Sequence, residues 1–195
     1  MALSAETGFR RYTYADLENF PDDNLRREII DGELIVTPSP VTRHQRAVVN
    51  IVVALAAYAK QNGGEVFPAP LDVYFAEDNV VEPDVLFVRA DHAERIEKKL
   101  IKDAPDLVVE ISSPSTRRLE LVRKRELYAR FGVFEYWYAD LEVDRVEIYR
   151  LADGDYPPPL LMFPGEVLSS TQLPGFSMPV VEALALPEDS GSMTL

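Results

Sequence analysis

The sequence predicts an α/β fold in which strands and helices alternate along the chain. Short runs rich in Val, Ile, Phe and Tyr flank two amphipathic segments, and turn residues separate them. The chain has 195 residues, of which 47% are hydrophobic and 27% are charged, as in a folded globular protein. We expect one domain over residues 1–195, with one sizeable core and a polar, fraying tail over 187–195.

The N-terminal part predicts a short helix, a hairpin and a long helix. Thr13 precedes the short helix as a cap, and extended segments within 28–36 flank an Asp-Gly turn that is typical of a hairpin. Residues 42–45 match a capping box, and apolar residues follow at helical spacing until Gly63. We therefore expect the first long helix to begin with Thr42 as its cap.

The middle of the chain predicts three consecutive strands and a surface helix. Extended runs over 65–70, 71–76 and 80–89 are rich in Val and Phe, and their spacing favours a β-meander. The charged segment 91–103 that follows is typical of a helix on the protein surface.

The second half predicts a buried strand, a helix and a hairpin. Residues 106–112 form an apolar run, and a helix over 116–131 follows it until Gly132. Segments 134–139 and 145–151 then flank a turn. A hairpin of this kind at a sheet edge can pair with a second copy, so we expect a homodimer.

Composition excludes several classes of site. The chain has no cysteine, which excludes disulfides, thiol nucleophiles and thiolate metal ligands, and its two histidines leave oxygen as the main metal ligand. The net charge of −13 counts against nucleic-acid binding without excluding it. No apolar run reaches the roughly 18 residues of a membrane helix, and no signal peptide precedes the fold, so we expect a cytoplasmic protein with no membrane partner.

Three acidic residues lie within or beside apolar strands: Glu28, Asp84 and Glu110. Alternation of side chains along a strand places Asp84 on the face of Leu86, and Glu110 on the face of Val108. If both strands belong to one sheet, the two carboxylates converge and offer the oxygen ligands that Mg²⁺ or Mn²⁺ prefers. The alternative is that each carboxylate ends its strand in solvent.

The helix after Glu110 carries three charged residues inside its apolar arc. At about 100° per residue, Arg117, Glu120 and Lys124 fall within an arc of roughly 120°. The apolar residues of that arc are Leu121, Leu127, Tyr128 and Phe131. This face therefore meets both the sheet and a polar pocket, and Lys124 is a candidate catalytic cation. The alternative is an exposed pair between Glu120 and Lys124.

Basic residues and one histidine are candidates for substrate binding. Residues 117–130 hold six basic against two acidic residues, a local charge of +4 that can hold a phosphodiester backbone through Arg117 and Arg123. His44 lies in the first turn of the long helix and can reach from the core edge into the pocket. The alternatives are a solvated helix flank and a buried histidine with a structural role.

Several motifs follow one another along the chain: 28–33, 38–40 with 44–45, 83–84, 105–115, 124–128 and 132–137. As a set they resemble the Uma-type family of putative restriction endonucleases in the PD-(D/E)xK nuclease superfamily, over residues 12–151. The resemblance implies a restriction-endonuclease-like fold, a mixed central β-sheet flanked by helices with the metal site at its edge.

The resemblance also implies roles for individual residues. Asp84 and Glu110 would bind Mg²⁺ or Mn²⁺, and Glu28 would be an additional catalytic acid. Ser112 stands where the superfamily motif has a lysine, and Lys124 matches a lysine relocated to the following helix. Glu120 replaces an aspartate that the family usually shows.

The implied function is metal-dependent hydrolysis of DNA phosphodiester bonds. The metal would polarise the phosphoryl group and activate water, and Lys124 would orient that water or stabilise the developing charge. One alternative is a non-catalytic relative with a binding or regulatory role, which the net charge and Ser112 favour. Another is a metal-dependent hydrolase that cleaves a small phosphoester or a glycosidic bond.

Overall fold

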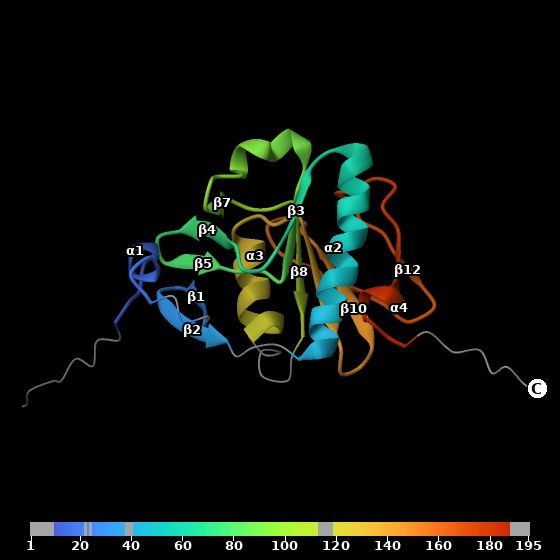
Figure 1. Ribbon diagram of the computed structural model, residues 1–195, viewed down its shortest axis with the longest axis horizontal. Helices are drawn as coiled ribbons and strands as arrows, with labels where there is room; N and C mark the ends of the chain where they lie inside the picture. Colours follow the sequence, from blue (N-terminus) through green and yellow to red (C-terminus); the bar gives the residue numbers. More distant parts are fainter. Residues whose placement is uncertain (1–9, 22, 24, 38–40, 113–118, 188–195) are drawn as a thin grey trace, which may run out of the picture.

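A computed structural model describes residues 10–21, 23, 25–37, 41–112 and 119–187 and shows a mixed α/β fold (Figure 1). Its central sheet has six strands in the order β11-β10-β9-β8-β6-β3, and only the neighbours β8 and β9 run parallel. The strands are β3 (Glu65–Pro68), β6 (Val85–Val88), β8 (Leu107–Ile111), β9 (Glu135–Asp140), β10 (Arg145–Arg150) and β11 (Leu160–Met162). The predicted α/β class with a mixed central sheet is confirmed.

A second mixed sheet has the strand order β2-β1-β5-β4-β7. Its strands are β1 (Arg26–Ile30), β2 (Glu33–Thr37), β4 (Asp72–Ala76), β5 (Asn79–Val81) and β7 (Leu100–Lys102). β12 (Val167–Leu168) and β13 (Met178–Pro179) form a separate short pair. The hairpin of β1 and β2 confirms the predicted Asp-Gly turn, in which Asp31 and Gly32 both have positive φ.

Helices cover both faces of the central sheet (Figure 1). The helices of the described residues are α1 (Tyr14–Leu17), α2 (Thr42–Asn62), α3 (Arg125–Arg130) and α4 (Val180–Ala183), with a 3₁₀ segment at Ala90–Arg95 (η1) and a π-helical segment at Leu119–Lys124 (η2). α2 and α4 pack on one face, and α3 packs on the other. Within the described ranges, no helix is long and apolar enough to cross a membrane.

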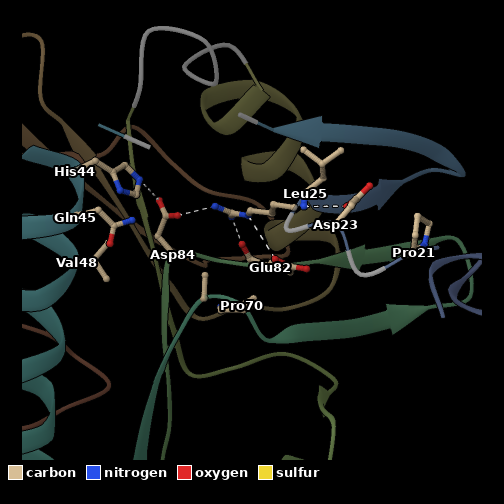
Figure 2. A pocket seen from close by; sticks show the side chains of 11 residues that line it. Pro21, Asp23, Leu25, His44, Gln45, Val48, Pro70, Glu82 and Asp84 are labelled. Carbon is tan, nitrogen blue, oxygen red and sulfur yellow. Dashed lines mark hydrogen bonds and ion pairs between the residues drawn. The ribbon is translucent and has the colours of Figure 1, made fainter. Parts of the chain in front are cut away.

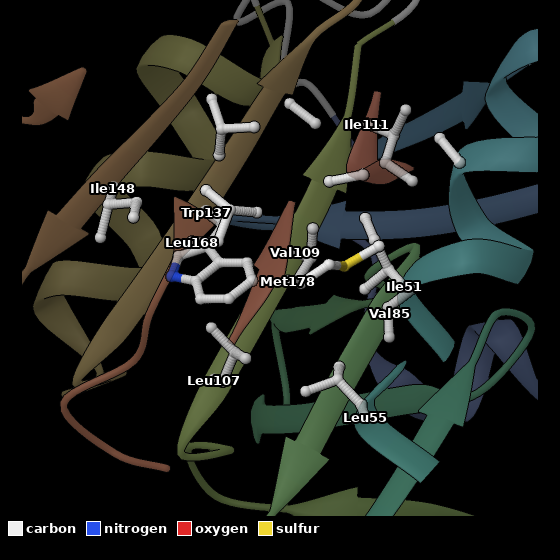
Figure 3. Close-up of a cluster of buried hydrophobic side chains, with 14 of the residues drawn as sticks. Ile51, Leu55, Val85, Leu107, Val109, Ile111, Trp137, Ile148, Leu168 and Met178 are labelled. Carbon is white, nitrogen blue, oxygen red and sulfur yellow. The ribbon is translucent and has the colours of Figure 1, made fainter. Parts of the chain in front are cut away.

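Two hydrophobic cores lie on opposite faces of the central sheet. On β6, Val85 and Phe87 face α2, whereas Leu86 and Val88 face the second sheet and α3. Trp137 on β9 is fully buried in the core beneath α2 (Figure 3). Because both faces are covered, these strands are apolar on both sides, and any charge among them needs a partner.

Several predicted elements are confirmed. The long helix α2 spans Thr42–Asn62 and ends at Gly63, and the apolar run after Asp106 is the buried strand β8. The predicted helix over 116–131 is described from Leu119 onward, and its earlier part lies outside the described residues. Its first part is π-helical rather than α-helical, a wider turn that periodicity does not reveal.

The predicted capping box of α2 is wrong. The residue that precedes the helix is Val41, in extended conformation, and its carbonyl accepts the amide of Gln45. Thr42 is already the first helical residue, and the capping residue Val41 has no side-chain hydrogen bond to the helix. The predicted motif therefore begins one residue after the true capping position.

The predicted β-meander is also wrong. β3 pairs with β6 in the central sheet, whereas β4 pairs with β5 in the second sheet. The run 80–89 is divided between the two sheets at Glu82-Pro83-Asp84, because Pro83 has no N–H to continue a ladder. Alternation along a strand identifies a strand but not the neighbour with which it pairs.

The predicted surface helix over 91–103 is replaced by η1 and β7. β7 pairs with β4 in parallel, and its Ile101 is fully buried in the second core. Burial of this side chain outweighs the helical tendency of the charged residues around it.

The premise of the expected homodimer is corrected as well. The hairpin of β9 and β10 is not an exposed edge, because β8 covers one side of it and β11 covers the other. The central sheet ends at β3 and β11 instead.

Leu55→Ala tests the core between α2 and the central sheet. Leu55 is fully buried, so its truncation should lower the free energy of unfolding by about 2–5 kcal/mol. Urea unfolding monitored by circular dichroism measures this change. Val53→Ala on the exposed side of the same helix is the control and should change stability by at most about 0.5 kcal/mol. Equal effects of the two substitutions would contradict the packing described here.

Candidate functional site

The pairing of β6 with β8 brings two of the predicted acidic residues together. Val85 pairs with Val109 and Leu86 with Val108, and the same register places Asp84 opposite Glu110. Residues opposite one another across two strands share a face of the sheet. The expected convergence of Asp84 and Glu110 is therefore present, and both side chains are buried rather than solvated at strand ends.

Asp84 is held by three donors from three elements, and Figure 2 shows the two that come from side chains. His44 Nε2 lies 3.0 Å from Oδ2, the Ile111 amide donates to the same oxygen at 2.8 Å, and Arg26 Nη1 donates to Oδ1 at 2.7 Å. Burial alone would raise the pKa of Asp84, but the His44 hydrogen bond and the Arg26 charge outweigh it and hold the pKa well below its usual range. Asp84 is therefore a carboxylate at neutral pH.

Glu110 is fully buried, and one of its two oxygens accepts hydrogen bonds from two side chains. Lys124 Nζ lies 2.8 Å from Oε1, and the Tyr128 hydroxyl donates to Oε1 at 2.5 Å. Oε2 accepts no hydrogen bond from any residue that the structure describes. Burial raises the pKa of Glu110, and the Lys124 charge only partly offsets it because Asp84 adds a like charge. An additional positive charge nearby would stabilise the ionised form of Glu110.

Lys124 lies in η2 with 1% of its surface exposed, between two glutamates. Its Nζ lies 2.7 Å from Glu28 Oε1 and 2.8 Å from Glu110 Oε1. Burial lowers the pKa of Lys124, but the charges of Glu110 and Glu28 outweigh it and raise the pKa above its ordinary value. The alternative of an exposed pair between Glu120 and Lys124 is wrong, because both side chains are buried.

Glu28 reaches the same cluster from β1. It is fully buried and accepts the amide of Glu82 at 2.8 Å in addition to its ion pair with Lys124. Burial would raise the pKa of Glu28, but the charges of Lys124 and Arg26 lower it below its ordinary value. Lys124 thus links Glu28 on the second sheet to Glu110 on the central sheet.

Glu120 completes a group of carboxylates with the spacing of a cation site. One oxygen each of Asp84, Glu110 and Glu120 lies within 4.8 Å of the others, and all three residues are buried. Such an oxygen-only set suits Mg²⁺ or Mn²⁺. Glu120 occupies the position where an aspartate was expected from the resemblance.

A cleft of about 390 Å³ opens beside Asp84 (Figure 2). Arg26 and Glu82 line it on the side of β1 and β5, and His44, Gln45 and Val48 line it from the first turns of α2. His44 therefore reaches the site as predicted, and it is also largely buried, as in the structural alternative. A ligand can reach the edge of the carboxylate cluster from solvent through this cleft.

Three residues of the site were missed by sequence reasoning: Arg26, Glu82 and Tyr128. Arg26 lies two residues before Glu28 on β1, so strand alternation places it on the same face. Tyr128 lies four residues after Lys124, on the same face of the helix. Same-face spacing could have identified these two, whereas Glu82 lies between the two sheets, where alternation gives no signal.

The other predicted residues lie away from the carboxylates or cannot be placed. Arg123 donates to the Ile30 carbonyl and pairs with Glu33 at 3.0 Å on the β1–β2 hairpin. Arg117 lies outside the described residues. The hydroxyl of buried Ser112, at the usual lysine position, accepts the amide of Leu141 and supports the β9–β10 turn.

Glu82→Gln tests the electrostatics of the cleft. Burial raises the pKa of Glu82 to about 7 from its ordinary 4.5, although Arg26 opposes the shift. Between these values Glu82 is protonated mainly in the folded protein, so the contribution of Glu82 to stability is highest at low pH and falls as pH rises towards 7. The variant avoids this loss, and its free energy of unfolding relative to the native protein should rise over this range in urea titrations. Glu65→Gln, at an exposed site, is the control, and parallel curves for both variants would contradict the assignment.

A solved structure with the same fold is a protein from Anabaena variabilis described as a putative nuclease belonging to DUF820. It superposes with a TM-score of 0.74 at 19% sequence identity, over 89% of this chain and 97% of the other. The likeness confirms the predicted fold. Among curated proteins, none matches the chain.

A family model described as "Uma2: Putative restriction endonuclease" matches residues 12–181. The match covers both sheets, α2, α3 and every described member of the carboxylate cluster. It also extends beyond residues 12–151, the range of the resemblance found from the motifs. The chain therefore belongs to the Uma2 family of putative restriction endonucleases.

Proposed function

We propose that this protein is a metal-dependent nuclease that hydrolyses phosphodiester bonds of DNA. The observation that carries the proposal is the buried set of Asp84, Glu110 and Glu120 oxygens beside Lys124, at the edge of an open cleft. The family and the related structure support a nuclease; the metal, the DNA substrate and the residue roles are our proposal.

The charge balance of the cluster favours a bound cation. Among the described residues, Arg26 and Lys124 face four acidic side chains, so the acids outnumber these two cations. The four acids are Glu28, Glu82, Asp84 and Glu110. Uncompensated charge in a buried site is costly, and Glu110 Oε2 accepts no hydrogen bond from the described residues. Oxygen-binding Mg²⁺ or Mn²⁺ fits this donor set.

Asp84 and Glu110 would hold the metal, with Glu120 as the third carboxylate. When bound, such an ion polarises a phosphoryl oxygen and lowers the pKa of a coordinated water. His44 and the Ile111 amide orient Asp84 through Oδ2, and Tyr128 and Lys124 orient Glu110 through Oε1. Each carboxylate therefore keeps one oxygen directed away from these donors.

Lys124 would stabilise charge at the reacting phosphate. An ammonium group has three N–H donors, and Glu28 and Glu110 accept two of them. The remaining donor can bind the attacking water or the developing negative charge. Glu28 keeps Lys124 charged and in position, which is the role we assign to this additional acid.

Substrate binding would use the cleft wall and the basic flank of the helix. His44 borders the cleft, and Arg123 lies on the outer side of η2 with 34% of its side chain exposed. Arg117 precedes η2 in the sequence and belongs to the same basic stretch. We also propose a homodimer, because cleavage of both strands of a duplex needs two such sites.

Ser112 is the observation that favours a second candidate, a non-catalytic nucleic-acid-binding relative. Its hydroxyl serves the β9–β10 turn and supplies no positive charge at the usual lysine position. This candidate predicts a protein that binds nucleic acid and cleaves none with Mg²⁺ or Mn²⁺. The two assays below separate it from the nuclease.

Asp84→Asn tests the metal site. Calorimetric titration of Mn²⁺ into the native protein should show saturable binding. Asp84→Asn should bind Mn²⁺ at least about tenfold more weakly, because it lacks a carboxylate ligand. Asp91→Asn, at an exposed residue that pairs with Arg89, removes the same charge elsewhere and should bind as the native protein does. Unchanged binding by Asp84→Asn would place the metal elsewhere.

Lys124→Met tests the catalytic cation. With Mg²⁺ or Mn²⁺, the native protein should cleave a fluorescent DNA duplex, and the variant should be slower by about 10²–10³-fold because a donor to the developing charge is lost. Circular dichroism checks that both proteins are folded. Lys102→Met, at an exposed lysine, is the matched control. Cleavage of RNA alone would redirect the substrate assignment, and full activity of Lys124→Met would refute its role.

A further inference from the structure

Arg26 is the second cation of the cluster, and its guanidinium group lies among four acids. Nη1 lies 2.7 Å from Asp84 Oδ1, and Nη2 lies 3.6 Å from Glu28 Oε1 and 3.8 Å from Glu110 Oε2. Nη2 also donates to the Glu82 carbonyl, and Nε lies 3.8 Å from the Glu82 carboxylate. Arg26 therefore shares Glu28 and Glu110 with Lys124 and also pairs with Asp84 and Glu82.

On Asp84 and Glu110, Arg26 faces the carboxylate oxygen that does not accept a hydrogen bond from the other donors. His44 and the Ile111 amide both use Oδ2 of Asp84, and Lys124 and Tyr128 both use Oε1 of Glu110. Asp84 Oδ1 accepts a hydrogen bond only from Arg26 among the described residues, and Glu110 Oε2 accepts none. These two oxygens are the ones available to a metal ion, and the guanidinium lies next to both.

We propose that Arg26 holds the place of the divalent cation in the metal-free protein, leaves it when the metal binds, and then binds a phosphate of the substrate. This inference rests on the proposed function, because it assumes a metal at Asp84 and Glu110. A guanidinium has only donors, so it cannot contribute to a metal's coordination and repels the ion. Exchange of one positive charge for two also improves the charge balance of the acidic cluster.

The cleft beside Asp84 can accommodate the Arg26 side chain once it leaves the carboxylates. Arg26 lines the cleft of about 390 Å³ and keeps 24% of its side chain exposed, whereas Asp84 and Glu110 are buried. The pairing of β1 with β2 and β5 holds its backbone, so only side-chain torsions need to change. The planar fork of a guanidinium matches two phosphate oxygens, which makes Arg26 a substrate-binding residue in the metal-bound protein.

Arg26→Gln tests the competition. Calorimetric titration should show that the variant binds Mn²⁺ at least about tenfold more tightly than the native protein, within the usual range of coupling between two ligands. Arg89→Gln, at an exposed arginine beyond the far end of β6, removes the same charge and should leave the affinity unchanged. Equal or weaker Mn²⁺ binding by Arg26→Gln would overturn the inference and leave the proposed function intact. Absence of binding to both proteins would overturn both.

A measurement on the native protein avoids dependence on the folding of the variant. The side-chain Nε resonance of Arg26 should shift on titration with Mg²⁺, and its buried proton should exchange faster with water once the guanidinium moves into the cleft. An unchanged Arg26 resonance at a Mg²⁺ concentration that saturates the protein would refute displacement.

The phosphate contact has its own test. With Ca²⁺ as the bound ion, the native protein should bind a short DNA duplex at least about tenfold more tightly than Arg26→Gln, while Arg89→Gln should bind as the native protein does. Arg26→Lys should restore part of the affinity, because an ammonium still attracts phosphate without the bidentate fork. Equal duplex binding by the native protein and Arg26→Gln would refute the substrate-binding role.

Discussion

Charge compensation inside the fold is the constraint on which the arrangement of this site depends. Glu28, Asp84 and Glu110 are almost completely buried, and isolated charges in such positions would destabilise the protein strongly. Lys124 and Arg26 compensate them from a helix and from a strand of the other sheet. The ion pairs therefore connect the two sheets and η2, and they fix the relative positions of the residues that we assign to catalysis.

Each structural layer contributes a different part of this arrangement. The register of β6 and β8 places Asp84 opposite Glu110, the hairpin of β1 and β2 supplies Glu28, and the N-terminal turn of α2 brings His44 to Asp84. The π-helical segment η2 directs both Glu120 and Lys124 inward. π-Helical turns often occur at functional sites.

Much of the fold and part of the site were predictable from local pattern. Strand alternation placed Asp84 on the face of Leu86 and Glu110 on the face of Val108, and helical periodicity identified Lys124 as an inward cation, because both patterns depend only on backbone geometry. The strand pairings were not predictable: β3 and β4 are neighbours in the chain but lie in different sheets. Strand alternation places Arg26 beside Glu28, but it could not identify the partners of Arg26 on the other sheet, which are up to 84 positions away in the sequence.

The sequence by itself determined the α/β class, the family motifs, the oxygen-rich character of the site and the identity of its main acids. These features follow from residue type and short-range periodicity. Only the tertiary structure decided that Arg26 faces Oδ1 of Asp84 and Oε2 of Glu110, that Arg123 contacts the β1–β2 hairpin, and that the β9–β10 hairpin is covered by β11. Such contacts join segments far apart in the chain, and they are selected by the packing and charge balance of the whole fold rather than by local propensity.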